Sequence, residues 1–285
     1  MVLEDTMNAL GAYLEHLSKR GRRPQTLSDY RISLTVLFRW MEAKGLCTNP
    51  AEISEDDILG IIREYEASES TMRLYIGNLS RFLRYCGNSV VQDMGLLWNA
   101  TQHPNVKWMD RLGFEKVLAE AVDPTDRMIV MLLAYAGLRR AEAADLGVAD
   151  ILSDRIVVTG KGHGKGKTRI IPLSKRLAAE IEKYMAVRQT ILGDRTVPYL
   201  LVGTARRRIG ACALGRRVHA LTQQAGVEAT PHSFRRYFAT EIWGRMPEKD
   251  ITVLQALMGH TSPEMTARYI QRNESAMCQA VDRLI

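Results

Sequence analysis

One stretch, Thr230-Pro231-His232-Ser233-Phe234-Arg235, combines the start of a helix with two side chains that can bind an anion. Thr230 suits the N-cap and Pro231 the first helical position, because proline lacks the N–H that would have no intrahelical partner there. His232 and Arg235 then lie one turn apart, beside the free N–H groups of the helix start. We therefore expect a phosphate site here, although a capped helix with a solvated basic pair fits this stretch alone equally well.

Two shorter runs downstream add residues of the same kind, Leu257-Met258-Gly259-His260 and Ala267-Arg268-Tyr269. Ser262-Pro263-Glu264 indicates that a helix restarts after His260, which places Tyr269 about two turns beyond that histidine. A lone tyrosine late in a helix more often belongs to the core, and a lone histidine is usually a hydrogen-bonded polar group. Only the joint pattern indicates a site, in which these two residues join His232 and Arg235 around one phosphate.

Length and composition fit a globular protein of two domains. The chain has 285 residues, of which 46% are hydrophobic and 25% charged, and this balance excludes a disordered or fibrous protein. No apolar run of transmembrane length and no secretory signal pattern occurs, so we expect a cytoplasmic protein without a membrane partner. Four cysteines stand far apart without metal-ligand spacing, which predicts free thiols and no structural metal.

Basic charge is concentrated in the second part of the chain. The formal net charge is +7, and the isoelectric point is about 9.3. Residues 1–103 contain 11 Lys and Arg against 13 Asp and Glu, a balance of −2, so the remainder contains 28 against 19, a balance of +9. This distribution favours a polyanion as the partner of the second part.

The first part has the periodicity of a compact helical bundle. Apolar residues at helical spacing predict helices over 7–17, about 26–43, from about 55, and over about 70–85. Ser54 and Asp57 resemble a capping box at the start of the third helix. In the fourth helix we expect four buried side chains, Leu74, Leu79, Phe82 and Leu83. The arginines of this part form either a solvated face or phosphate contacts, and the candidates for DNA binding are Arg22, Arg23, Arg73 and Arg81.

A polar, weakly periodic segment, residues 99–107, is the candidate linker between the two parts. After it, helices are expected from Asp110 to about Val122 and from Pro124 to Tyr135, the second of them buried. A further amphipathic helix should run from Ser174 to about Gln189, and another should end near Gln224.

Two adjacent arginines, Arg139 and Arg140, follow the expected buried helix. They must reach the surface or an anionic partner, since an unpaired buried charge is expensive. Glu142 lies one turn past Arg139 and could hold its guanidinium in place. Either arginine could clamp an anion, and the spacing to Glu142 favours Arg139.

Residues 156–159 and 168–172 are expected to form two short strands. The turn between them is rich in glycine and carries Lys161, Lys165 and Lys167. It is not a phosphate-binding P-loop, because a strand rather than a helix follows it. The lysines are therefore either a solvated hairpin tip or mobile cations that enter a DNA groove.

More arginines cluster ahead of the helix that ends near Gln224. They flank a stretch of small residues and are Arg206, Arg207, Arg208, Arg216 and Arg217. Such clustering beside a helix favours a phosphate-binding surface, with a solvated face as the alternative.

Five of these motifs resemble, in order and rough spacing, those of the tyrosine recombinases, the phage-integrase and Xer-like family. The five are the Arg139 run that begins at Ala136, Gly160-Lys161-Gly162, Pro231-His232 with Arg235, Leu257-Met258-Gly259-His260, and Tyr269. The resemblance implies a mainly α fold with a small β-sheet. Residues 1–103 would form a helical core-binding, SAM-like domain, and residues 104–285 an α+β catalytic domain, with no separate arm-type DNA-binding module ahead of them.

The resemblance also implies a nucleophile and its clamp. Tyr269 would attack a DNA phosphodiester and form a 3′-phosphotyrosyl link, while Arg139 and Arg235 hold the non-bridging oxygens. Planar guanidiniums match those oxygens better than point charges do. Glu142 would support Arg139.

Roles for a lysine and two histidines follow from the same resemblance. Lys161 would protonate the departing 5′-oxygen, and Lys165 remains open as its rival because the hairpin is long and rich in lysine. His232 would assist proton transfer from the tyrosine, and His260 would donate to the phosphate. No metal ion, ATP or other cofactor is expected, because arginine supplies the positive charge and the covalent intermediate stores the energy of the broken bond.

The implied partners are double-stranded DNA target sites and further copies of the chain, as a homo-tetramer that exchanges strands through a Holliday junction on paired sites. The tail, residues 270–285, would dock on a neighbouring subunit or pack on its own domain. The protein would be nucleoid-associated or encoded by a virus or mobile element. Two other functions fit the same scaffold: a type IB topoisomerase acting as a monomer, and a non-catalytic DNA-binding regulator.

Overall fold

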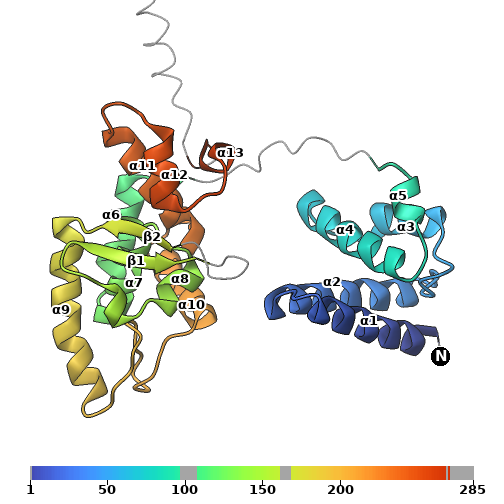
Figure 1. Cartoon of the computed structure of the whole chain (residues 1–285), viewed down its shortest axis with the longest axis horizontal. Coiled ribbons are helices and arrows are strands. Elements are labelled where there is room, and N and C mark those ends of the chain that lie inside the picture. Colours follow the sequence, from blue (N-terminus) through green and yellow to red (C-terminus); the bar gives the residue numbers. More distant parts are fainter. Residues whose placement is uncertain (1, 97–107, 161–167, 268, 270–285) are drawn as a thin grey trace, which may run out of the picture. The chain divides into compact units, whose positions relative to one another are not determined.

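The structure, a computed structural model, describes residues 2–96, 108–160, 168–267 and Tyr269. The chain divides into two compact units, residues 1–104 and 105–285 (Figure 1). The expected linker over residues 99–107 lies outside the described residues, which resume at Trp108. In the described ranges, no helix is both long and apolar enough to cross a membrane.

The first unit is a bundle of helices around one apolar core. Its helices are α1 (Val2–Lys19), α2 (Pro24–Ala43), α3 (Glu55–Glu64), α4 (Glu69–Tyr85) and the short α5 (Val90–Asp93). Leu37, Phe38, Ile58 and Phe82 are completely buried in this core. The predicted helical character of this part is confirmed.

Local signals in the first unit act as predicted, with one exception. At the start of α3, Ser54 Oγ accepts from the Asp57 N–H at 3.3 Å and Asp57 Oδ2 accepts from the Ser54 N–H at 2.9 Å, so the capping box is confirmed. The prediction that Leu74 is buried is wrong, because this residue is 55% exposed. Met72 and Ile76 are buried instead. At 3.6 residues per turn, Leu74 lies about 160° around α4 from Met72 and therefore faces away from the core.

The second unit packs helices and a two-stranded sheet around one buried helix. In chain order its elements are α6 (Arg111–Glu120), α7 (Pro124–Tyr135), α8 (Arg140–Asp145), the 3₁₀ turn η1 (Val148–Asp150), β1 (Arg155–Thr159), β2 (Thr168–Pro172), α9 (Lys175–Leu192), α10 (Ala211–Gln224), α11 (Pro231–Arg245), α12 (Ile251–Met258) and α13 (Pro263–Ala267). The central helix is α7, whose residues 128–134 are all buried and which contacts α9 and α11 (Figure 1). The mainly α fold with a small sheet is confirmed.

β1 and β2 form an antiparallel pair in which Ile156 lies opposite Ile171. Side chains alternate along a strand, so Arg169 and Ile171 are buried on one face of β2 while Thr168 and Ile170 are exposed. The glycine-lysine turn between the strands, residues 161–167, lies outside the described residues. The sheet therefore sends a charged side chain, Arg169, into the interior of the unit.

The chain leaves α7 through Gly137, whose φ is +57°. This left-handed conformation favours glycine. The position is also crowded, because an added Cβ atom would overlap the ring of Phe238 on α11. The Gly137 carbonyl accepts a hydrogen bond from Arg235 of the same helix. Gly137 therefore lets α7 and α11 approach closely and sets the start of the segment that carries Arg139.

Replacing Gly137 with alanine should lower the free energy of unfolding by about 2 kcal/mol or more, since strain at positive φ and overpacking against Phe238 act together. Gly11→Ala in α1 is the matched control, because nothing lies within 4 Å of an added Cβ there. Alanine at that helical position should instead stabilise by roughly 0.5–1 kcal/mol. Urea denaturation followed by circular dichroism measures both, and equal stability of the Gly137→Ala and wild-type chains would contradict the expectation.

Candidate active site

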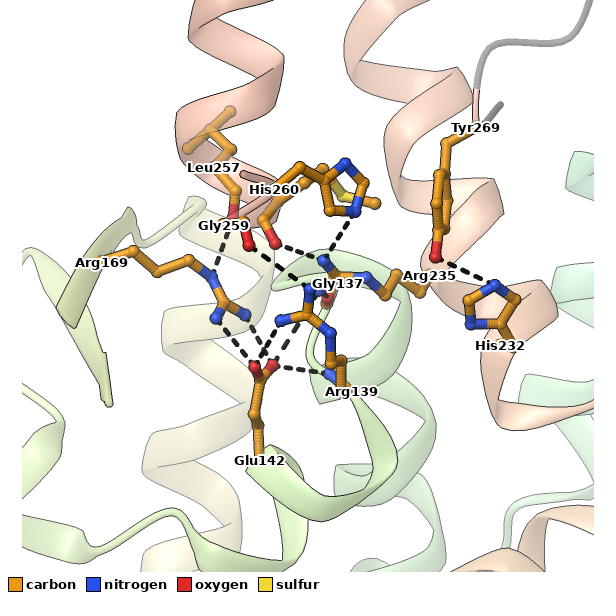
Figure 2. A network of polar contacts seen from close by, with 11 residues as sticks. Gly137, Arg139, Glu142, Arg169, His232, Arg235, Leu257, Gly259, His260 and Tyr269 are labelled. Carbon is orange, nitrogen blue, oxygen red and sulfur yellow. Dashed lines mark hydrogen bonds and ion pairs between the residues drawn. The ribbon is translucent and has the colours of Figure 1, made fainter. Parts of the chain in front are cut away.

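Among the residues that the structure describes, three arginines from different elements converge on the carboxylate of Glu142 in α8 (Figure 2). Arg139 immediately precedes α8, Arg169 lies on β2, and Arg235 lies on α11. We call Arg139, Arg169 and Arg235 the arginine cluster. Segments far apart in the sequence therefore meet at one buried acid.

Arg139 and Arg169 share both oxygens of Glu142. Oε1 accepts from Arg139 Nη1 at 2.7 Å and from Arg169 Nη1 at 3.0 Å. Oε2 accepts from the backbone N–H of Arg139 at 2.8 Å and from Arg169 Nη2 at 2.7 Å. Burial alone would raise the pKa of Glu142, but the hydrogen bonds and charge of Arg169, with the contacts of Arg139, outweigh burial and lower this pKa to about 2. Glu142 is therefore ionised at neutral pH.

The end of α12 supplies a second set of contacts to the arginine cluster. The last carbonyls of a helix lack partners within the helix and lie at the negative end of its dipole. Three successive carbonyls at the end of α12 each accept a hydrogen bond from one arginine (Figure 2). The pairs are Arg169 Nε with Leu257 O at 3.0 Å, Arg235 Nη2 with Met258 O, and Arg139 Nη2 with Gly259 O at 3.4 Å.

Arg235 is 0% exposed. Besides Met258 O it donates to Gly137 O, while its Nε finds no hydrogen-bond partner in the described part of the chain. Burial, followed by the positive charge of Arg139, lowers the pKa of Arg235 to about 10. The interpretation of His232 and Arg235 as a solvated basic pair is therefore excluded.

The arginine cluster and Glu142 together carry a charge of +2, since three guanidiniums face one carboxylate. Such an excess is unfavourable away from water unless an anion joins it. Arg139 is the accessible member, because its side chain is 40% exposed against 7% for Arg169 and 1% for Arg235. The charge of the site therefore favours an anion that binds beside Arg139.

His260 lies between Arg235 and a buried threonine. Its Nε2 is 3.3 Å from Arg235 Nη2, and its Nδ1 is 3.0 Å from Thr266 Oγ1. An arginine can only donate, so Nε2 accepts and the proton of the neutral imidazole resides on Nδ1, which donates to Thr266. Burial and then the charges of Arg235 and Arg139 lower the pKa of His260 to about 4. In this state His260 needs a second proton before it can donate to a phosphate.

His232 and Tyr269 form the other half of the site. Tyr269 Oη lies 3.0 Å from His232 Nε2 (Figure 2). His232 keeps an exposed surface, yet the partial removal of its ring from water, followed by the charges of Arg236 and Arg235, lowers its pKa to about 4. At neutral pH His232 is therefore uncharged and can accept a proton from the tyrosine hydroxyl. The Tyr269 ring also lies 5.9 Å from the Arg235 guanidinium carbon.

Tyr269 is not inside a helix, although the sequence suggests a position about two turns beyond His260. α13 ends at Ala267, and the Tyr269 N–H donates to Thr266 O at 2.9 Å in a turn. The helix does restart at Pro263, as predicted. The nucleophile candidate is therefore held by the last turn of a short helix and by His232.

A groove of about 1230 Å³ opens along the accessible side of the arginine cluster. It is lined by β1, β2, α8, α12 and α13, and its polar residues include Arg139, Arg169, His260 and Thr261. Gly160 and Thr168, the described residues on either side of the glycine-lysine turn, also line it. Lys161, Lys165 and Lys167 lie outside the described residues, so the choice between Lys161 and Lys165 stays open.

The structure separates Arg139 from Arg140. Arg140 is exposed, and its side chain lies against Gly215 of α10. A Cβ atom added to Gly215 would be 3.1 Å from Arg140 Nη1. Arg139 instead joins Glu142 and lines the groove. The geometry therefore places Arg139, rather than its neighbour, at the candidate phosphate site.

The other arginines considered for DNA binding lie outside the arginine cluster. Some are engaged within the chain: Arg208 pairs with Asp145, Arg217 with Asp123 and Asp126, Arg73 with Glu69, and Arg81 with Gly77 O. Arg22, Arg206, Arg207 and Arg216 are exposed and Arg23 is half-buried. Arg208 and Arg217 brace the second unit, which gives them a structural role that clustering in the sequence did not indicate.

Two buried polar residues of the site were missed by the sequence analysis, Arg169 and Thr266. For Arg169 a signal exists, because period-2 alternation puts it on the same face of β2 as the core residue Ile171. No comparable pattern marks Thr266. Within the described ranges, no group of three or more His, Cys, Asp or Glu residues is arranged to hold a metal ion.

Comparison with known proteins gives matches over both units. Residues 112–276 match the phage integrase family, and residues 10–88 match the phage integrase N-terminal SAM-like domain. Tyrosine recombinase XerA from Pyrococcus horikoshii is 31% identical over 172 residues, which cover 59% of this chain and only 58% of the relative. Tyrosine recombinase XerC from Chromohalobacter salexigens is 27% identical over 291 residues, covering 96% of this chain and 94% of the relative.

Solved structures share the fold. A lambda integrase dimer bound to a COC' core site matches with a TM-score of 0.74 at 18% identity, covering 93% of this chain and 95% of that chain. A lambda integrase tetramer bound to a Holliday junction matches with a TM-score of 0.68 at 18% identity, covering 95% and 78%. At such identities the likeness concerns the fold alone.

The two site histidines should stay neutral well below the usual histidine pKa of about 6.5. Because burial and neighbouring arginines lower both pKa values to about 4, His232 and His260 should remain uncharged at pH 5.5 and take up a proton only near pH 4. Nitrogen NMR of histidine-labelled protein measures this directly. The chain unfolded in urea is the control, with midpoints near the usual value; half-protonation of both folded histidines at pH 6.5 would contradict the assignment.

Thr266→Val should leave the Nδ1–H of His260 without its acceptor in a buried place. The expected loss is about 1–3 kcal/mol in the free energy of unfolding, together with a shift of the His260 tautomer signals. Thr266→Ser keeps the hydroxyl and is the matched control. Unchanged imidazole nitrogen shifts in the valine variant would show that Thr266 does not set the tautomer.

Proposed function

The chain belongs to the phage integrase family, the tyrosine recombinases, and we propose that it is a site-specific recombinase that cuts and rejoins double-stranded DNA through Tyr269. The observation that carries the proposal is the 3.0 Å contact between Tyr269 Oη and a neutral His232, beside an arginine cluster with a charge excess of +2. A nucleophile, a proton acceptor and an anion site are thus adjacent.

Cleavage would begin with attack of Tyr269 Oη on the scissile phosphorus. His232 Nε2 takes the phenolic proton as the oxygen–phosphorus bond forms. The bond from phosphorus to the 5′-oxygen breaks, which leaves a 3′-phosphotyrosyl link and a 5′-hydroxyl. A lysine of the glycine-lysine turn, Lys161 or its rival Lys165, supplies the proton for that hydroxyl.

The arginine cluster would stabilise the charge that develops on the non-bridging oxygens. Arg139 is its accessible member, and Arg235 lies beneath it with an Nε that has no partner among the described residues. Guanidiniums fixed in advance by Glu142 and the end of α12 need not reorganise when charge develops. His260, once protonated in the presence of the phosphate, would add a further donor.

Rejoining would reverse these steps. The 5′-hydroxyl attacks the phosphotyrosyl phosphorus, the lysine takes its proton, and His232 returns a proton to Tyr269. The energy of the original phosphodiester is kept in the covalent link, so the proposal contains no step that consumes ATP. If the attacking hydroxyl belongs to another duplex, the outcome is strand exchange.

Strand exchange requires paired sites, and we infer a homo-tetramer that passes through a Holliday junction. This assembly is supported by the fold shared with lambda integrase, a tetramer of which is bound to such a junction. Residues 104–285, with their excess of basic charge, would form the catalytic domain, and residues 1–103 the core-binding domain. The tail over residues 270–285 would dock on the neighbouring subunit and couple cleavage to assembly.

Covalent trapping tests the proposal. Duplexes selected by the protein from a random-sequence library, and nicked near the cleavage point so that rejoining fails, should yield an adduct that resists denaturation and is destroyed by protease. Tyr269→Phe should abolish the adduct. Tyr237→Phe is the matched control, because Tyr237 is a buried tyrosine of α11 that stacks on Phe114 at 4.9 Å and takes no part in the mechanism.

Each other outcome of the trapping experiment would support a different alternative. An adduct with Tyr269→Phe would show that another residue is the nucleophile. Binding without an adduct for any selected duplex would favour a DNA-binding regulator. Adduct formation and relaxation of supercoils by a monomer, without exchange between two sites, would favour a topoisomerase.

A further inference from the structure

Arg169 takes no part in the proposed chemistry, yet it makes more contacts with Glu142 than Arg139 does through its side chain. It is 8% exposed and donates one Nη to each carboxylate oxygen, at 3.0 Å and 2.7 Å. This is the two-point fork that arginine and carboxylate form most readily. Arg139, the residue at the candidate phosphate site, has only a single side-chain contact with the same acid, from Nη1 at 2.7 Å.

The way in which Arg169 and Arg139 share the lone pairs of the Glu142 carboxylate limits the contacts that Arg139 can make. A carboxylate offers about four lone-pair sites. Arg169 takes one on each oxygen, the backbone N–H of Arg139 takes one on Oε2, and Arg139 Nη1 takes one on Oε1. Arg169 thereby occupies the position on Glu142 at which an arginine can bind both oxygens. Arg139 is restricted to a single side-chain hydrogen bond with the acid, here called an end-on contact, which leaves much of its guanidinium free.

We propose that Arg169 is a positioning residue: by occupying the fork of Glu142 it keeps Arg139 end-on, with a free edge directed at the phosphate. The proposal rests on the proposed function of this site. Without Arg169, Arg139 and Glu142 can close into a fork of their own. The Arg139 guanidinium then turns toward the acid and away from the substrate.

Arg169 also fixes the segment against which Arg139 and His260 lie. Its Nε donates to Leu257 O at 3.0 Å. Its aliphatic stem fills the space beside Gly259, where an added Cβ would be only 2.9 Å from Arg169 Cδ. The carbonyl of that glycine accepts a hydrogen bond from Arg139, and the next residue is His260. One side chain from β2 therefore orders both the acid and the helix end that flank Arg139.

A purely structural role is the competing explanation, in which Arg169 only neutralises a buried carboxylate. Both explanations predict lower stability when Arg169 is removed. Only the positioning role predicts that phosphate binding is also weak when lysine replaces Arg169, because lysine keeps the counter-charge but not the planar fork. Experiments must therefore separate phosphate affinity from folding.

Inorganic phosphate is a probe that requires no knowledge of the DNA site. Binding to the full-length chain can be followed through the imidazole nitrogen signals of His260, which lies beside the site. Arg169→Met should weaken phosphate binding by about tenfold or more, and Arg169→Lys should weaken it nearly as much, because lysine keeps the charge but not the planar fork. Unchanged affinity in Arg169→Met would overturn the proposal.

Arg188→Met is the matched control. Arg188 is also buried, and it donates to Leu200 O, Tyr199 O and Val197 O within the second unit, at 3.0, 2.8 and 2.5 Å. Its removal should reduce stability without changing phosphate affinity. An equal loss of affinity in Arg188→Met and Arg169→Met would assign both effects to folding and overturn the positioning role.

The double variant Glu142→Gln/Arg169→Met addresses the case in which Arg169→Met alone does not fold. It removes the buried acid together with its counter-charge. Phosphate affinity should remain reduced, since the acid that holds Arg139 and the arginine that limits it to one contact are then both absent. Recovery of wild-type affinity in the double variant would show that Arg169 acts only as a counter-ion.

Cleavage gives an independent readout if the proposed function holds. A misplacement of about 1 Å can reduce a rate on the order of 100-fold. Arg169→Met should therefore slow adduct formation by about that factor on a phosphodiester, and by much less on a methylphosphonate, which lacks the negative oxygen that Arg139 holds. Equal slowing on both substrates would overturn the proposal. If the wild-type chain binds phosphate but cleaves no DNA, this result would instead count against the proposed function.

Discussion

A single buried carboxylate determines how the second unit is built around its site. Glu142 holds Arg139 and Arg169 directly, and Arg235 Nη1 lies 3.9 Å from it. On the opposite side the same guanidiniums meet the last carbonyls of α12. Neither set of acceptors alone could keep three like charges together. Since the two sets come from α8 and α12, the cluster also ties the sheet, α11 and α12 to one another.

The balance of charge in this arrangement joins binding to chemistry. One carboxylate cannot neutralise three guanidiniums, so the site retains a net positive charge. The field of that charge disfavours protonation of the histidines beside it. Burial, followed by that field, lowers the pKa of both His232 and His260 to about 4. A neutral His232 is what a tyrosine needs as proton acceptor. A phosphate that enters would supply the missing negative charge and raise both pKa values, so the substrate itself would help the histidines to keep the protons they receive.

Local signals predicted most elements, because they depend on neighbouring residues only. Pro231 begins α11, Ser54 caps α3, and the apolar run of α7 is buried as expected. Long-range pairing was not predictable in this way. The ion pairs of Arg217 with Asp123 and Asp126 join residues more than ninety positions apart, and nothing local distinguishes such an arginine from one that contacts phosphate. Arg169 was overlooked because a strand was assigned from its apolar neighbours, although the same alternation turned its charge inward.

The two halves of the site differ in how firmly they are held. Arg235 and Arg169 are buried, and each is fixed by contacts to two or more other elements. Tyr269 follows a helix of five residues and is oriented by His232 and by the turn to Thr266. Opening of that short helix would displace Tyr269, the proposed nucleophile, while the arginine cluster keeps its contacts. The reverse does not hold, because loss of the cluster would release the end of α12 and with it His260, whose contact with Thr266 anchors α13. The position of the proposed nucleophile therefore depends on the structure of the proposed phosphate site.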